Sequence, residues 1–451
     1  MSCFRRYLRK GRDAGEIATG LILAMTILAE LAAAESPEAV FEANRDSLFV
    51  VESYDRISNN KNSVGSGFAV KMGASAKLRI ATNYHVVADA VLEPDAYGIR
   101  IAALGGEPML TEILAADPIH DLAVLRPTES TELSANEGAT TGLASGLPAG
   151  LALASEKPTV GEDIFALGNP FDVGLSVVPG VYNGELKKHF RPLIHFTGAL
   201  NPGMSGGPAV NSRGDVIGIN VAGAGNSVGF LVPVAELAAL MNTAPEEAEL
   251  STIREQFSDR LLAHSQALVD DLVAGDWSLE TFGPLQIPKE LRDYVNCRGA
   301  AKTEDDDRRW SRSVSDCRVE DRLYLSQGFD TGPIEMQFTL LESDQLSAIQ
   351  FSELFSKESF RPFNRGGKEE FTDFDCVERW TTLPNLGEQR FKASYCVRAY
   401  LDFPELFDVL YVARGVPKSR LGVNLHYTLA GVGRDAANKF HERFVGAPQW
   451  N

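Results

Sequence analysis

Short apolar runs separated by glycine-rich or polar turns fill the chain from Ser47 to about Pro233. Examples are SLFVVES (47–53), DLAVLRP (121–127) and DIFALGNP (163–170). Short strands at regular spacing with turn residues between them are typical of an all-β barrel or sandwich. The pattern therefore predicts an all-β domain, preceded by a short helix from Pro37 to Asn44.

The pattern changes at about Asn242. Between Pro245 and Gly275 the apolar residues recur at helical spacing, at Leu250, Ile253, Phe257, Leu261, Leu268 and Leu272. This periodicity predicts a connector helix within 243–280. Beyond it, residues 323–329, 335–342, 393–403 and 408–415 have strand patterns, and 345–357 has a helical one. An α+β domain is expected over 281–451.

Length and charge narrow the classes of function. A chain of 451 residues is long enough for two or three domains, each with its own core. Its formal net charge is −18. Nucleic acid attracts proteins with clustered lysine and arginine, so this charge argues against a nucleic-acid partner. A protein or peptide partner fits better.

The first 34 residues have the pattern of an export signal. Five basic residues precede an apolar run from Ile17 to Leu31, and Ala32 to Ala34 offer small residues for cleavage. We expect cleavage after Ala34, an exported protein that is periplasmic or secreted, and no stable membrane span once the signal is removed. The alternative is an uncleaved signal that anchors the protein.

Residues 128–150, rich in Ala, Gly, Ser and Thr, indicate a surface loop.

The cysteines point to the same compartment. Cys3 lies in the signal, and the other four are spaced in two pairs with intervals of 20 residues: Cys297 with Cys317, and Cys376 with Cys396. An even number of cysteines in an exported chain favours disulfides, here two local bridges. A zinc site is the rival interpretation, although no pair has the close spacing that structural zinc sites usually show.

Three stretches carry candidate chemistry. IATNYHVVAD places His85 after a predicted strand, PIHDLAVLRP places Asp121 before another, and NPGMSGGPAV places Ser205 among glycines. Each has an ordinary structural explanation when taken singly. Together, in the order His, Asp, Ser and in a β-rich exported chain, they suggest a nucleophilic serine with a base and an orienting carboxylate.

The sequence motifs around these three residues resemble those of a known family. Residues 47–235 resemble a chymotrypsin-fold, trypsin-like serine protease of the HtrA/Deg type, through GSGFAV (65–70), TNYHVV (82–87), ALGNPF (166–171), NPGMSGGP (201–208) and VGFLVP (228–233). The resemblance implies two six-stranded β-barrels, with the active site between them, within a protease domain at 35–242. It covers somewhat less than half of the chain.

The resemblance also implies roles for residues. His85, Asp121 and Ser205 would form a catalytic triad that cleaves peptide bonds through an acyl-enzyme, with no metal and no cofactor. The backbone around Gly203, Met204 and Ser205 would form the oxyanion hole. By the spacing of such enzymes, the specificity pocket would comprise Ala199, Leu200, Ile219, Asn220 and Val221. Because none of these is acidic, we expect small or medium aliphatic residues before the cleaved bond.

Other readings stay open at this stage. No PDZ peptide-binding module is recognisable after Asn242, so neither substrate recruitment nor a caged oligomer follows from the resemblance, and the oligomeric state is unknown. An inactive or chaperone-like binding module with a protease fold is the main alternative function. An esterase with the same triad is a weaker one.

Overall fold

A computed structural model describes residues 36–451 except 72–76, 104, 129–147, 226, 303–308, 359 and 361–365. The predicted export signal and most of the predicted loop at 128–150 lie outside these residues. No helix in the described part is long and apolar enough to cross a lipid bilayer.

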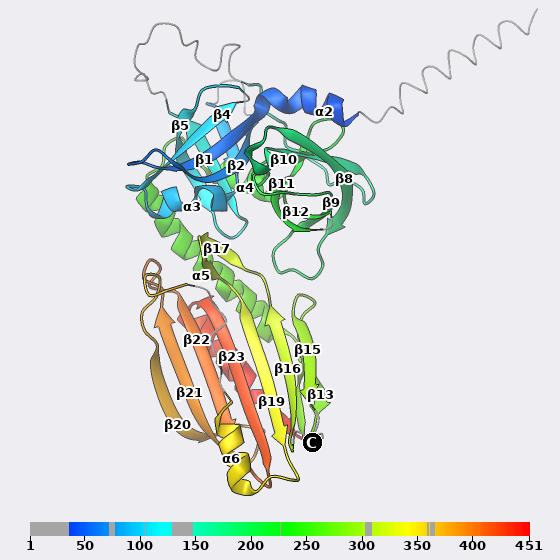
Figure 1. Cartoon of the computed structure of the whole chain (residues 1–451), viewed down its shortest axis with the longest axis vertical. Coiled ribbons are helices and arrows are strands. Elements are labelled where there is room, and N and C mark those ends of the chain that lie inside the picture. Colours follow the sequence, from blue (N-terminus) through cyan, green and yellow to red (C-terminus); the bar gives the residue numbers. More distant parts are fainter. Residues whose placement is uncertain are drawn as a thin grey trace, which may run out of the picture.

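Two closed antiparallel barrels of six strands each form the first part of the molecule, and they lie side by side in Figure 1. They confirm the predicted chymotrypsin fold. The first barrel comprises β1 (Leu48–Asp55), β2 (Lys61–Val70), β3 (Arg79–Thr82), β4 (Tyr97–Ala103), β5 (Met109–Asp117) and β6 (Leu122–Pro127). The second comprises β7 (Asp163–Gly168), β8 (Ser176–Glu185), β9 (Ile194–Thr197), β10 (Pro208–Val210), β11 (Val216–Gly225) and β12 (Val228–Pro233).

Helices frame the barrels. Helix α2 (Pro37–Asn44) has the predicted bounds, with the hydroxyl of Ser36 accepting from the N–H of Ala39 as an N-cap. Helix α3 (Tyr84–Leu92) follows β3, and α4 (Val234–Thr243) follows β12. His85 follows β3, which ends at Thr82, and lies in the first turn of α3, which begins at Tyr84.

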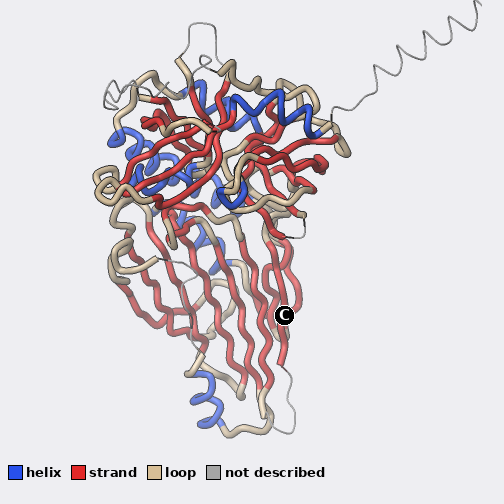
Figure 2. The backbone as a smooth tube through the Cα atoms, turned by 45° about the horizontal axis from the view of Figure 1, so that its top comes forward, coloured by secondary structure: helices blue, strands red, loops and turns tan. Residues whose placement is uncertain are grey.

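The C-terminal part is built on a seven-stranded antiparallel sheet. Its order is β15 (Asn296–Lys302), β16 (Ser311–Val319), β19 (Ile334–Glu342), β23 (Leu421–Val432), β22 (Phe407–Gly415), β21 (Arg390–Ala399) and β20 (Asp375–Thr382). Smaller elements are β13 (Ser278–Phe282), β14 (Leu285–Glu290), β24 (Gln449–Trp450), the β17 (Leu323–Ser326) and β18 (Phe329–Thr331) hairpin, α6 (Ala348–Ser356) and α7 (Arg434–Gly446). Figure 2 shows the length of this sheet and α6 at its far end.

Helix α5 (Leu250–Ala274) joins the two parts by belonging to both cores. Its first half places Ile253, Phe257 and Leu261 in a core with the first barrel. Its second half places Leu268 and Leu272 in a core with the sheet and α7. In Figure 1, α5 runs from the first barrel down along the sheet. The predicted connector is therefore a packing element shared by two cores.

The cysteines are paired as their spacing suggested. Cys297 and Cys317 face each other across β15 and β16 with a sulfur–sulfur distance of 2.05 Å. Cys376 and Cys396 face each other across β20 and β21 at 2.08 Å. Each disulfide therefore links an edge strand of the sheet to its neighbour, one at each edge.

Candidate active site

The loop before β10 presents Ser205 and depends on two glycines. Gly203 and Gly206 have φ values of +94° and +85°, in the region that glycine adopts without strain. A Cβ atom would lie 2.3 Å from the carbonyl oxygen of Asn169 at Gly203, and 2.2 Å from that of Ser66 at Gly206. Both positions therefore require glycine for conformation and for space.

Hydrogen bonds from the first barrel fix this loop. The hydroxyl of Ser66 donates to the carbonyl of Gly203 at 2.7 Å, and the N–H of Ser66 donates to the carbonyl of Ser205 at 2.7 Å. The same Ser66 hydroxyl accepts from the N–H of Asn169 at 2.8 Å. Ser66 thus ties the serine loop to β2 and to the end of β7. It lies in the word GSGFAV, but sequence reasoning gave it no role.

The predicted oxyanion residues differ in the state of their N–H groups. The N–H of Met204 donates to the carbonyl of Asn201 at 3.0 Å, and its side chain is fully buried. The N–H groups of Gly203 and Ser205 donate to no acceptor in the described part of the chain. The backbone at these two residues therefore has two unengaged donors beside the Ser205 hydroxyl, while Met204 serves to pack the loop.

His85 and Asp121 form a close pair. The Nδ1 atom of His85 lies 2.6 Å from Oδ2 of Asp121, and the His85 backbone N–H donates to Oδ1 at 2.8 Å. Asp121 has φ of +55°, and its carbonyl accepts from the side-chain amide of Asn83 at 2.7 Å. Two bonds to one carboxylate fix both the position and the plane of the imidazole.

The surroundings of His85 act on its pKa in opposite directions. Burial lowers the pKa of His85, whereas the negative charge of Asp121 and its hydrogen bond raise it. The balance leaves the pKa of His85 above its ordinary value. The side chain remains 28% exposed, so one side of the ring is open to a reactant.

Ser205 and His85 line one cavity of about 380 Å³. The hydroxyl of Ser205 donates to the carbonyl of Val221 at 3.3 Å, and no hydrogen bond joins it to His85 among the described residues. Active-site hydrogen bonds of unliganded enzymes are often long and tighten when substrate binds. The arrangement thus brings the Ser205 hydroxyl and the imidazole of the His85–Asp121 pair to one cavity.

The residues predicted for the specificity pocket lie at different places around this cavity. Leu200, Asn220 and Val221 line the cavity, but Ala199 and Ile219 do not. Ile219 is fully buried in the core between the barrels because it points inward from β11. Ala199 is exposed on the loop surface. The lining residues that the sequence did not indicate are Val64, Asn201, Pro202 and Gly223.

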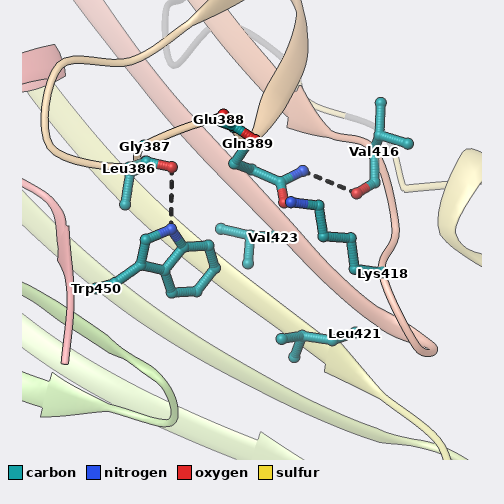
Figure 3. Close-up of a pocket in the computed structure, with 9 residues that line it drawn as sticks. All are labelled: Leu386, Gly387, Glu388, Gln389, Val416, Lys418, Leu421, Val423 and Trp450. Carbon is teal, nitrogen blue, oxygen red and sulfur yellow. Dashed lines mark hydrogen bonds between the residues drawn. The ribbon is translucent and has the colours of Figure 1, made fainter.

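A second cavity, of about 260 Å³, lies in the C-terminal part and is drawn in Figure 3. Trp450 closes one side, with its indole N–H donating to the carbonyl of Leu386 at 3.0 Å. The amide of Gln389 donates to the carbonyl of Val416 at 2.8 Å. Its lining contains no serine, histidine or cysteine.

The two barrels are similar in sequence to known peptidases. Residues 65–219 match the family model described as a trypsin-like peptidase domain. A probable periplasmic serine endoprotease DegP-like from Ectopseudomonas mendocina (strain ymp) is 34% identical over 173 residues, covering 38% of this chain and 31% of that protein. Protease Do-like 1, chloroplastic, from Arabidopsis thaliana is 32% identical over 184 residues, covering 38% of this chain and 36% of that protein. The match thus spans about a third of each relative.

Two solved structures match parts of this chain. The crystal structure of the serine endoprotease from Yersinia pestis is 24% identical with a TM-score of 0.36, covering 46% of this chain and 66% of that chain. The active form of a protease from M. tuberculosis is 21% identical with a TM-score of 0.37, covering 47% of this chain and 87% of that chain.

Proposed function

We propose that this chain, which carries an HtrA/Deg-like, trypsin-like peptidase domain, is an extracytoplasmic serine endopeptidase that hydrolyses protein or peptide substrates. One observation carries the proposal: Ser205, two unengaged backbone N–H groups and the His85–Asp121 pair meet at one cavity. The family match supports the reaction class. The relative named periplasmic and the two disulfides support a location outside the cytoplasm.

The chemistry would follow from the residue types. The Ser205 hydroxyl turns from the Val221 carbonyl toward His85 and attacks the peptide carbonyl, while Nε2 of His85 takes its proton. Asp121 holds the ring tautomer and stabilises the imidazolium. The imidazolium then protonates the leaving amine, and water hydrolyses the acyl-enzyme by the same route.

The oxyanion would be held by the backbone. The N–H groups of Gly203 and Ser205 would donate to the oxygen that becomes negative in the tetrahedral intermediate. Preformed donors of this kind need no rearrangement at the moment of reaction. Their loss typically lowers the rate by roughly 10² to 10³.

The cavity lining favours apolar side chains in the substrate. Leu200, Val221 and Gly223 are apolar, and none of the residues lining the cavity is acidic. A lysine or arginine side chain would lose its hydration there without gaining an ionic partner. We therefore propose a preference for aliphatic residues before the cleaved bond. Mapping of cleavage sites on a denatured protein tests this, and dominant cuts after lysine or arginine would contradict it.

A second function is favoured by the position of the Ser205 hydroxyl on Val221 rather than on His85. A protein-binding module with an idle site would keep that arrangement when substrate is bound. The esterase alternative has no comparable observation in its favour.

A fluorophosphonate probe separates the two functions, because it labels only a serine that its histidine has activated. The full chain should be labelled at Ser205 and should cleave casein, and Ser205→Ala and His85→Ala should each abolish both signals. An unlabelled, folded wild-type protein would support the idle binding module. Casein cleavage that survives in Ser205→Ala would exclude Ser205 as the nucleophile.

A further inference from the structure

The helix that carries His85 is packed against the C-terminal part. Tyr84, the first residue of α3, is fully buried, and its hydroxyl donates to the carbonyl of Leu325 in β17 at 2.8 Å. Its ring also meets Phe257 of α5 edge-on, with centroids 5.0 Å apart. The start of α3 is therefore held by two elements that lie after the barrels in the chain.

Tyr324, next to Leu325 in β17, reaches His85 itself. The two rings are T-shaped, with centroids 5.9 Å apart and an angle of 71° between their planes. Tyr324 also meets the ring of Tyr84 at 6.4 Å. Among the aromatic residues that the structure describes, Tyr324 is the one whose ring contacts the imidazole of His85. It belongs to the C-terminal part and to neither barrel.

The turn that carries Asp121 is held from the same side. Arg260 of α5 lies 3.3 Å from the carboxylate of Asp117, which also holds the ring of His120 at 2.9 Å. Arg191 donates to the carbonyl of Ile119 and, at 2.7 Å, to the carboxylate of Asp321, which lies two residues before β17. Both members of the His85–Asp121 pair thus sit on segments that later parts of the chain hold in place.

The serine loop has a different set of supports. Its hydrogen bonds run to Ser66 of β2, to Phe171 between β7 and β8, and to Asn220 of β11. The contacts of the C-terminal part are therefore directed to the base and its carboxylate, and not to the nucleophile.

We propose that the β17–β18 hairpin and α5 act as a positioning element for the His85–Asp121 pair, with Tyr324 as the residue that fixes the imidazole ring. This inference rests on the proposed peptidase function. Asp121 restrains the ring at Nδ1, and Tyr324 packs against the ring and excludes water from the side that it covers. The Nε2 atom then stays directed toward Ser205, where a small misplacement would slow proton transfer strongly.

The titratable groups around His85 are compatible with a positioning role for Tyr324. Asp121 and Tyr324 are the titratable groups in contact with His85 in the described part of the chain. Burial raises the pKa of Tyr324, and the nearby carboxylates of Asp89, Asp121 and Asp330 raise it further. Tyr324 is therefore neutral across the working range. It changes the hydration of His85 without adding a competing charge.

Variants of the full chain test the proposal through the rate of fluorophosphonate labelling at Ser205, measured across pH. Tyr324→Ala removes the ring, Tyr324→Leu keeps apolar bulk at the interface, and Tyr324→Phe keeps the ring without the hydroxyl. Tyr395→Ala is the matched control, because Tyr395 is a half-buried tyrosine of the seven-stranded sheet that contacts Tyr411 and His441 instead.

We expect labelling to fall roughly threefold to tenfold in Tyr324→Ala and Tyr324→Leu, the factor that an aromatic pair contributes. Tyr324→Phe and Tyr395→Ala should label as the wild type does. In Tyr324→Ala the acidic limb of the profile should move to higher pH, because a hydrated imidazole binds its proton more readily.

Two results would overturn the inference while leaving the peptidase assignment intact. One is wild-type labelling with an unmoved acidic limb in both Tyr324→Ala and Tyr324→Leu. The other is an equal loss in Tyr324→Phe with an unmoved limb, which would indicate a structural role alone. If Tyr324→Ala does not fold, Tyr324→Leu carries the test. Absence of Ser205 labelling in the wild type would instead contradict the proposed function.

Discussion

A single methyl group at Gly203 should disable the site. Gly203→Ala would place a Cβ 2.3 Å from the Asn169 carbonyl oxygen in a backbone with φ of +94°, so the loop must move. The N–H groups of Gly203 and Ser205 would lose their direction. We expect kcat/KM for a peptide substrate to fall at least about 100-fold.

The matched control for that change is Gly105→Ala. Gly105 also has positive φ, at +70°, but a Cβ there would meet no atom within 4 Å. Gly105→Ala should lower thermal stability slightly and leave kcat/KM unchanged. Equal losses of activity in the two variants would mean that backbone strain, and not the serine loop, accounts for the effect.

The His85–Asp121 pair should make activity and stability respond oppositely to pH. Catalysis needs a neutral imidazole, so kcat/KM should fall as pH drops through the raised pKa of His85. The raised pKa means that the pair stabilises the fold fully below the unfolded value of about 6.5. That contribution is lost as pH rises through the folded-state pKa.

Asp121→Asn should remove both effects. We expect kcat to fall roughly 10⁴-fold, as is typical when the orienting carboxylate is lost. The Tm of the wild type should exceed that of Asp121→Asn by the largest amount at mildly acidic pH. This difference should shrink toward alkaline pH. A difference in Tm that grows with pH would contradict the sign argued from His85.

At the scale of elements, the two disulfides are a natural comparison. Both close loops of the same length at opposite edges of one sheet. Removing either by paired Cys→Ala changes should cost about 3 kcal/mol of unfolding free energy through the entropy of the unfolded chain. Cys317 also packs in the main core of the C-terminal part. We therefore expect the Cys297/Cys317 pair to cost more than the Cys376/Cys396 pair in urea titrations, and equal costs would argue against the packing contribution.

At the scale of the whole molecule, α5 should couple the unfolding of the two parts. Phe257 is fully buried and meets Tyr84 of the first barrel. Phe257→Ala should cost about 3–5 kcal/mol and uncouple the barrels from the sheet. Leu272→Ala is the control, because Leu272 lies on the same helix but in the core that α5 forms with the sheet and α7.

The tryptophans make this coupling measurable. All four, Trp277, Trp310, Trp380 and Trp450, lie in the C-terminal part. Thermal unfolding followed by tryptophan fluorescence therefore reports that part, while loss of Ser205 labelling reports the barrels. The two midpoints should coincide in the wild type and in Leu272→Ala, and separate in Phe257→Ala. Separate midpoints in the wild type would show that the two cores unfold independently.

The sequence by itself determined the elements whose signals are local. Short apolar runs between turns predicted the barrel strands, helical periodicity predicted α5, and equal intervals predicted which cysteines pair. Strand β23 was not predicted, although its polar residues Asn424, His426 and Thr428 alternate with apolar ones; in the structure these polar side chains are buried as well. The short sequence motifs around His85, Asp121 and Ser205 also marked these three residues as candidates.

Only the tertiary structure decided how those residues meet their surroundings. Ala199 turned out to be exposed and Ile219 to be buried in the core, because loop conformation and strand direction decide which side chains reach the cavity. The position of Tyr324 beside His85 depends on packing between segments far apart in the chain. Spacing along a sequence carries no information about such contacts, because folding brings distant segments together through burial of surfaces that neither segment specifies alone.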